Sequence, residues 1–338
     1  MRILVILLMA AVLPAADPVV IGFGSCLRQD RPAPALEAIL ARPRDLWVFL
    51  GDNAYLDTGD PAALAAGYRV LLDRPDVRTL IAGPLAAIWD DHDYGRNDGG
   101  VEWTGKHAAR AAFCDAFALP ADDPRRTRPD GIYAERLVER DGIRVQMLLL
   151  DTRWNRDPLR RRTTPRGPGQ GPWEAHPEDA DATLLGEAQW RWLEDRLATP
   201  ATARIIASSI QVVADGHGWE TWGNLPKERR RLWRAVAASG SAPVMVISGD
   251  RHFAELSVMP DGPDGPDRPI WDLTSSALNQ TAPAEARTNP RRWGDPTLEP
   301  NSGEIVVAAD GSLTARLLGP EGRVLLSRTL AGRSGGTP

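Results

Sequence analysis

Short apolar runs alternate with segments of helical spacing over most of the chain. The runs have the length and composition of buried strands, and they lie at 19–26, 45–52, 84–91, 144–153, 204–213, 242–256 and 269–278. Between them, apolar residues recur three or four positions apart, as in amphipathic helices, at 32–41, 61–83, 105–120 and 184–199. This alternation predicts an α/β protein, in which ligands bind beyond the carboxyl ends of the strands.

The last part of the chain has a different pattern. Residues 303–330 alternate strand-like runs with the turn pairs at 310–311 and 321–322, which predicts an antiparallel β-meander. Stretches rich in proline, glycine or charge predict long surface loops at 158–181, 260–269 and 283–300. We therefore expect an α/β fold with a β-rich C-terminal end.

The N-terminus has the order of a secretory signal peptide. Arg2 precedes an apolar run from Ile3 to about Leu13, and small residues follow before Asp17. The run is too short to span a bilayer comfortably, and no second long apolar run follows it. We expect a signal peptide at 1–16, one domain at 17–332, export to the periplasm or the extracellular space, and no membrane anchor in the mature chain.

Composition narrows the range of partners. The 338 residues are 43% hydrophobic and carry a net charge of −5, which argues against binding to a nucleic-acid backbone. Basic clusters at 125–128, 160–162 and 229–231 are interpreted as solvated surface. Cys26 and Cys114 allow one disulfide, but Cys114 lies in a helical pattern that favours a small buried apolar residue.

Side chains with acidic, basic or metal-binding groups follow most of the predicted strands. The stretch "IWDDHDYG" at 88–95 places three acidic residues and a histidine at the end of an apolar run. Carboxylates that leave a core are costly unless a positive charge compensates them. The strand ends together carry Cys26, Asp52, Asn53, Tyr55, Asp90, Asp91, His92, Asp151, Arg153, Gln211, Asp250 and His252.

In a shared sheet these side chains would converge on one crevice, where several buried carboxylates need a cation of high charge. Thiolate, phenolate and imidazole suit a transition metal, and oxygen ligands suit a hard ion such as calcium. The mixture predicts two unlike metals in one site, an arrangement that commonly clamps a phosphoryl group. Taken singly, each of these residues also fits a turn or a core position. The prediction therefore depends on the occurrence of many such residues together at the strand ends.

Four motifs occur in the order "GSC", "GDNAY", "WDDHD" and "SGDRHF", with "LDTR" and "QWRWLEDRL" between the last two. In these motifs the chain resembles the alkaline phosphatase D (PhoD-like) branch of the calcineurin-like metallophosphoesterases, from about Val19 to Leu273. The resemblance implies the calcineurin-like metallophosphatase fold, a four-layer α/β/β/α sandwich. It also implies a phosphoesterase that hydrolyses phosphomonoesters or phosphodiesters through a metal-bound hydroxide.

The resemblance further implies roles for the matching residues. A ferric ion would be bound by Cys26, Tyr55 and His252. Asp52 would bridge this ion to a second metal, calcium or another divalent ion, with Asp91 and Asp250 as its further ligands.

The catalytic residues implied by the resemblance are His92, which would protonate the leaving alcohol, and Arg153, which would neutralise phosphate. A structural ion pair with Asp151 is the alternative for Arg153. Asp90 and Asp93 are expected to hold the loop and orient His92.

The chain departs from the family in two places. The run at 204–213 has no histidine where the superfamily has one, so Gln211 or Ser209 is considered there, and Asn97 or Asp98 is considered for the second metal. The signal segment has no twin-arginine pair, which leaves the place of metal loading open.

Two alternatives remain. The chain is also consistent with a non-catalytic extracytoplasmic binding protein on the same fold, whose 12 tryptophans would serve a carbohydrate or lipid ligand. If the chain is an enzyme, its phosphate-ester substrate is a monoester or a diester, and the choice depends on the loops at 158–181, 215–226 (with Trp219 and Trp222) and 283–300.

Overall fold

The computed structural model describes residues 16–262, 265–282 and 288–331. The predicted signal peptide, except for Ala16, lies outside the described residues. In the described ranges, no helix is both long enough and apolar enough to cross a membrane.

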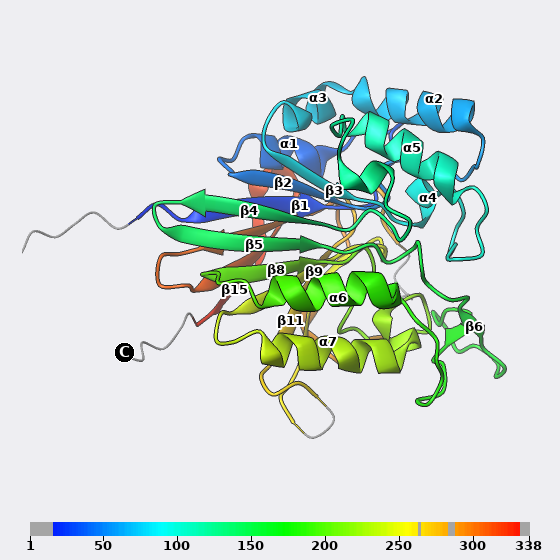
Figure 1. Ribbon diagram of the computed structural model, residues 1–338. Coiled ribbons are helices and arrows are strands. Elements are labelled where there is room, and N and C mark those ends of the chain that lie inside the picture. Colours follow the sequence, from blue (N-terminus) through cyan, green and yellow to red (C-terminus); the bar gives the residue numbers. More distant parts are fainter. Residues whose placement is uncertain (1–15, 263–264, 283–287, 332–338) are drawn as a thin grey trace, which may run out of the picture.

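Two sheets stand at the centre of the described fold (Figure 1). The first has six strands in the order β15 (Val324–Leu330), β14 (Leu313–Leu318), β13 (Ser302–Val307), β1 (Val19–Gly24), β2 (Leu46–Leu50) and β3 (Leu85–Ile88). The second has seven in the order β12 (Arg292–Thr297), β10 (Ala254–Met259), β11 (Ile270–Ser275), β9 (Val244–Ser248), β8 (Ala203–Ala207), β5 (Ile143–Leu149) and β4 (Ala134–Arg140). A short pair, β6 (Arg160–Arg161) and β7 (Trp173–Glu174), lies apart from them.

Each sheet has a parallel centre. Strands β1, β2 and β3 run parallel in the first sheet, and β5, β8, β9 and β11 run parallel in the second. The C-terminal strands β13, β14 and β15 form the predicted antiparallel meander, which joins the first sheet because Ile305 of β13 pairs with Ile21 of β1. The carboxyl ends of several parallel strands thus meet at one edge, where the polar residues of the sequence follow.

Helices cover the outer faces of both sheets. Figure 1 shows α1 (Pro34–Leu40), α2 (Pro61–Leu72), α3 (Pro75–Ile81) and α5 (Lys106–Ala116) on the side of β1 to β3, and α6 (Gly186–Leu197) and α7 (Pro226–Ala238) on the side of the second sheet. The short α4 (Asp91–Tyr94) starts directly after β3.

Three apolar clusters hold these layers together. Side chains such as Ile21 and Met245 fill the space between the two sheets. Trp47 and Phe113 belong to the cluster under the first set of helices, and Trp190 to the cluster under α6 and α7. Burial of such side chains is the main stabilising contribution to the fold. The predicted four-layer α/β/β/α sandwich is therefore confirmed.

Several predicted elements have different bounds. The helix expected over 61–83 is two helices, because Pro75 disfavours a helical conformation at the residue before it. The strand expected over 204–213 ends at Ala207, and the run at 242–256 is divided between β9 and β10. The charged edge strand β4, the helix α7 and the strand β12, inside a predicted loop, were not predicted.

Candidate metal centre

The predicted ligands lie where strands end, and their backbone is unusual there. Cys26, Asp52, Asp250 and His252 have φ angles of 57°, 49°, 72° and 60°. Non-glycine residues rarely adopt this left-handed region, and such strain concentrates at functional sites. At Gly51, a Cβ atom would lie 2.5 Å from the Cβ of Asp90, so glycine permits the close approach of the segments that carry the acidic residues.

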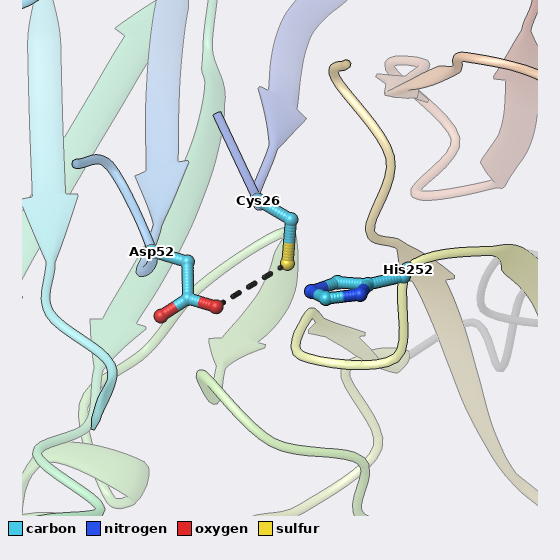
Figure 2. A group of neighbouring side chains, drawn as sticks. All are labelled: Cys26, Asp52 and His252. Carbon is cyan, nitrogen blue, oxygen red and sulfur yellow. Dashed lines mark hydrogen bonds between the residues drawn. The ribbon is translucent and has the colours of Figure 1, made fainter. Parts of the chain in front are cut away.

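One group of donors gathers around Cys26. The ligand atoms of Cys26, Asp52 and His252 all lie within 4.8 Å of one another, and Figure 2 shows the three side chains facing a common point. The Cys26 Sγ lies 3.5 Å from Asp52 Oδ2, and the Tyr55 hydroxyl lies 2.9 Å from His252 Nε2. The four residues predicted around the ferric ion are thus brought together; their role as ligands stays a prediction.

A second group of donors adjoins the first through Asp52. Ligand atoms lie within 4.8 Å of one another in the sets Asp52–Asp91–His92, Asp90–Asp91–Asp250 and Asp91–Asp98–Glu220. Asp52 therefore belongs to a set on each side, as expected of a residue that bridges two metals. The first of these sets also gives His92 the alternative role of a metal ligand.

The charged forms of several acidic groups in this cluster are disfavoured by burial and by their acidic neighbours. Burial, followed by the neighbouring Asp91 and Cys26, raises the pKa of Asp52 well above its usual range. Burial likewise raises the pKa of Asp250 to about 7 and that of the Cys26 thiol to about 12. For Asp91, burial acts in the same direction, but Arg153 and His92 outweigh it and lower the pKa to about 2.

Bound cations would offset the cost of burying these negative charges together, because they favour the charged form of every donor around them. The donor set fits the predicted metals: thiol, phenol and imidazole lie on one side of Asp52, and carboxylates lie on the other.

His92 is held by a carboxylate that sequence reasoning missed. The Asp57 Oδ1 lies 2.7 Å from His92 Nδ1, and the His92 ring lies against the Tyr55 ring, with 4.1 Å between centroids. Burial lowers the pKa of His92, but the hydrogen bond with Asp57 and the charge of Asp91 outweigh it and raise the pKa to about 9. A cation bound beside Asp91 would lower this pKa again.

The expected roles of Asp90 and Asp93 are only half right. Asp93 accepts hydrogen bonds from the backbone N–H groups of Asn53, Ala54 and Asp90, so it does hold the loop. The His92 ring is instead hydrogen-bonded with Asp57, and Asp90 is paired with Arg153. Nothing in the sequence separates Asp57 from neighbouring acidic residues, because its significance comes from a fold that brings it to His92.

Arg153 lies behind the cluster and not in the cleft. Its side chain is fully buried, and its guanidinium donates to Asp90 and, at 2.6 Å, to Glu220. The alternative of an ion pair with Asp151 is wrong in its partner, since Asp151 accepts a hydrogen bond from the Arg153 backbone. This position favours a structural role, and the predicted contact of Arg153 with phosphate stays a prediction.

A cleft of about 280 Å³ opens over the cluster. Asn97 and Asp98 line it, as considered for the second metal, whereas Gln211 is buried and donates to Glu255 and Thr274. Of the two loop tryptophans, Trp219 lines the cleft and Trp222 is buried. Within the described ranges the cleft is lined by Asp52, Asp91, His92, Asn97, Asp98, Trp219, Glu220, Asp250, Arg251, His252 and Ala282.

The two cysteines do not form a disulfide. Both are free and buried. Cys114 packs on α5 among apolar side chains such as Phe113, as its helical pattern predicted. Cys26 faces the cluster, where its sulfur contacts Asp52 and Ser276.

The fold is that of the calcineurin-like metallophosphatases. A solved structure described as "Structure of PhoD" matches with a TM-score of 0.69 and 17% identity over 94% of this chain and 70% of the other. A purple acid phosphatase from yellow lupin seeds matches with a TM-score of 0.64 and 11% identity over 94% of this chain and 54% of that one. Plasmodium GAP50, described as the anchor in the inner membrane complex, matches with a TM-score of 0.59 and 10% identity over 94% and 90%.

The sequence itself matches the family described as PhoD-like phosphatase over residues 67–316, and the chain belongs to this family. A search of curated proteins finds no match. The predicted family resemblance is therefore confirmed.

Proposed function

We propose that the protein is an exported phosphoesterase that uses a ferric ion and a second, divalent metal such as calcium. The observation that carries this proposal is the position of Asp52. Its carboxylate shares one set of donor atoms with Cys26 and His252 and another with Asp91 and His92. Two metal positions with a common carboxylate suit phosphoryl transfer, because a metal pair supplies an activated nucleophile and neutralises phosphoryl charge.

The protein side chains would do the remaining work. A substrate phosphoryl group in the cleft would lie beside His92, whose Nδ1 is engaged by Asp57. His92 Nε2 is then the nitrogen that can give a proton to the oxygen of the leaving alcohol. Asp57 would keep the imidazole in the required orientation and stabilise its charged form. Trp219 and Ala282 also line the cleft that would receive the substrate.

Export and the choice between monoester and diester belong to the same proposal. Export rests on the order of charge, apolar run and small residues at the N-terminus. One observation supports the alternative of a non-catalytic binding protein. GAP50, which is described as an anchor, has a similar fold. This alternative predicts loss of donor residues at the cleft, yet all six predicted metal ligands lie at or beside it.

The test is hydrolysis of aryl phosphate monoesters and diesters by the metal-loaded protein and by Asp52→Asn. We expect turnover by the wild type and loss of both metal content and activity in the variant. Asp73→Asn, on an exposed ion pair with Arg78, is the matched control and should behave as the wild type. A wild type that holds metal and hydrolyses neither substrate class would contradict the proposal.

A further inference from the structure

Arg251 lines the cleft between two predicted metal ligands. Successive side chains of an extended segment point to opposite sides, but Asp250, Arg251 and His252 all line the same cleft. The positive φ angles of Asp250 and His252 account for this arrangement. The strained turn after β9 therefore aims a guanidinium, as well as two predicted ligands, at one space.

The guanidinium of Arg251 lacks a hydrogen-bonded acceptor among the described residues. The residue is 7% exposed, and its Nε is buried without a hydrogen-bond partner. Its ion pair with Asp250 is long, at 3.7 Å, and its other contacts are with the Trp219 and Phe253 rings, 5.3 Å and 5.9 Å from their centroids. A buried charge without hydrogen bonds is costly, so such a group calls for a ligand.

Arg153 and Arg156 show what a structural arginine looks like in this protein. Both side chains are fully buried, and both pair with Glu220 at distances of 2.6 Å and 2.8 Å. Arg251 is nearly as buried but is held by aromatic faces, which fix the plane of a guanidinium without using its donors. Its donors remain available to an anion that enters the cleft.

We propose that Arg251 binds the non-esterified oxygens of the substrate phosphoryl group, with Trp219 holding the guanidinium in place. The inference rests on the proposed phosphoesterase function. A planar fork of donors suits two oxygens of one tetrahedral oxyanion, which phosphate esters and free phosphate share. Among the lining residues that the structure describes, Arg251 is the only arginine, and the acidic groups around it would repel an anion.

The test uses the metal-loaded protein and two substitutions. Arg251→Met keeps the apolar stem and removes the charge, and Arg251→Lys keeps the charge and removes the fork. Steady-state KM and kcat are measured with aryl phosphate monoesters and diesters, and the Kd of inorganic phosphate by equilibrium dialysis. Metal content and Tm are measured alongside. Arg69→Met, an exposed residue of α2, is the control.

For Arg251→Met we expect unchanged metal content and an increase of about 10- to 100-fold in KM and in the Kd of phosphate. Arg251→Lys should recover only part of this loss, and Arg69→Met should match the wild type. If Arg251→Met does not fold, Arg251→Lys decides, because a purely structural cation would leave its phosphate affinity at the wild-type value.

The two proposals fail in different ways. Wild-type phosphate affinity and KM in both Arg251 variants would overturn the role of Arg251 while leaving the enzyme intact. A metal-loaded wild type that hydrolyses no ester would overturn the proposed function, and phosphate dialysis would still test Arg251. Absence of phosphate binding by the metal-loaded wild type would overturn the inference itself.

Discussion

Asp57 Oδ1 lies 2.7 Å from His92 Nδ1 at the edge of the cleft. The two residues are 35 positions apart, and Asp57 adopts a positive φ of 46° to reach the ring. Asp57 is placed as a carboxylate that fixes the tautomer of a catalytic imidazole. It leaves Nε2 as the nitrogen for the substrate.

Substitution of Asp57 should impair catalysis and spare the metals. We expect Asp57→Asn to lower kcat by about 10- to 100-fold, because the imidazole loses its oriented, charge-stabilising partner. Metal content should be unchanged, since Asp57 belongs to none of the donor sets. Asp60→Asn is the control, because Asp60 caps α2 and asparagine is an equally good N-cap. Equal kcat in both variants would show that Asp57 does not act through His92.

Removal of the imidazole should expose a dependence on the leaving group. We expect His92→Ala to lose roughly 10²- to 10⁴-fold in kcat with an alkyl phosphate and far less with a nitrophenyl phosphate, whose alcohol leaves without a proton. Metal content should be retained, and His176→Ala, on a surface loop, should behave as the wild type. Equal losses with both substrates would argue against the general acid, and loss of metal would make His92 a ligand.

Metal binding should release a proton from Cys26. Burial raises the pKa of this thiol to about 12, so it is protonated at neutral pH, whereas a metal-bound thiol is deprotonated. Titration of the metal-stripped protein with ferric ion in weak buffer should therefore release about one proton fewer in Cys26→Ala than in the wild type. Cys114→Ala, which removes the buried thiol of α5, should release as many protons as the wild type. Identical release in Cys26→Ala would exclude thiolate ligation.

A buried carboxylate far from the cleft should make stability depend on pH. Glu304 of β13 is 1% exposed and accepts hydrogen bonds from Arg42 at 2.9 Å and from its cross-strand neighbour Arg316 at 2.8 Å. Burial raises the pKa of Glu304, but these hydrogen bonds outweigh it and hold the pKa below its ordinary 4.5. The stabilisation is therefore complete above about pH 4.5 and is lost as the pH falls through the lowered folded-state pKa.

Glu304→Gln should lower the free energy of unfolding by about 1–3 kcal/mol at pH 7, since the arginines are partly exposed. The difference from the wild type should shrink as the pH falls below 4.5. Urea unfolding at several pH values measures this, with Glu299→Gln, on the exposed pair with Arg323, as a control expected to change little. A difference that is constant with pH would show that the charge of Glu304 does not stabilise the folded state.

Local patterns in the sequence predicted much of the fold. Apolar runs marked the parallel strands, and the glycine turns at 310–311 and 321–322 marked the meander of β13 to β15. The edge strand β4 escaped detection because its half-exposed residues are mostly charged. Pro75 could have predicted that the helix expected over 61–83 is divided in two. The helical spacing of apolar residues on both sides of this proline favoured one continuous helix instead.

A residue of the site could be predicted from the sequence only if it lies within a recognisable short motif. Cys26, Asp52 and His252 follow strand ends and fall within short motifs, and the structure brings their donor atoms together. Asp57 and Arg251 acquire their places from loop conformation and from partners distant in the sequence, such as His92 and Trp219. No periodicity or spacing encodes such contacts, so they become visible only in three dimensions.

Elemental analysis of the protein purified without chelators would show whether the dinuclear site holds metal. We expect about one iron per chain together with calcium or another divalent ion, and loss of both in Asp52→Asn. A protein that holds no metal, even after incubation with iron and calcium, would contradict the dinuclear site and favour the non-catalytic binding protein.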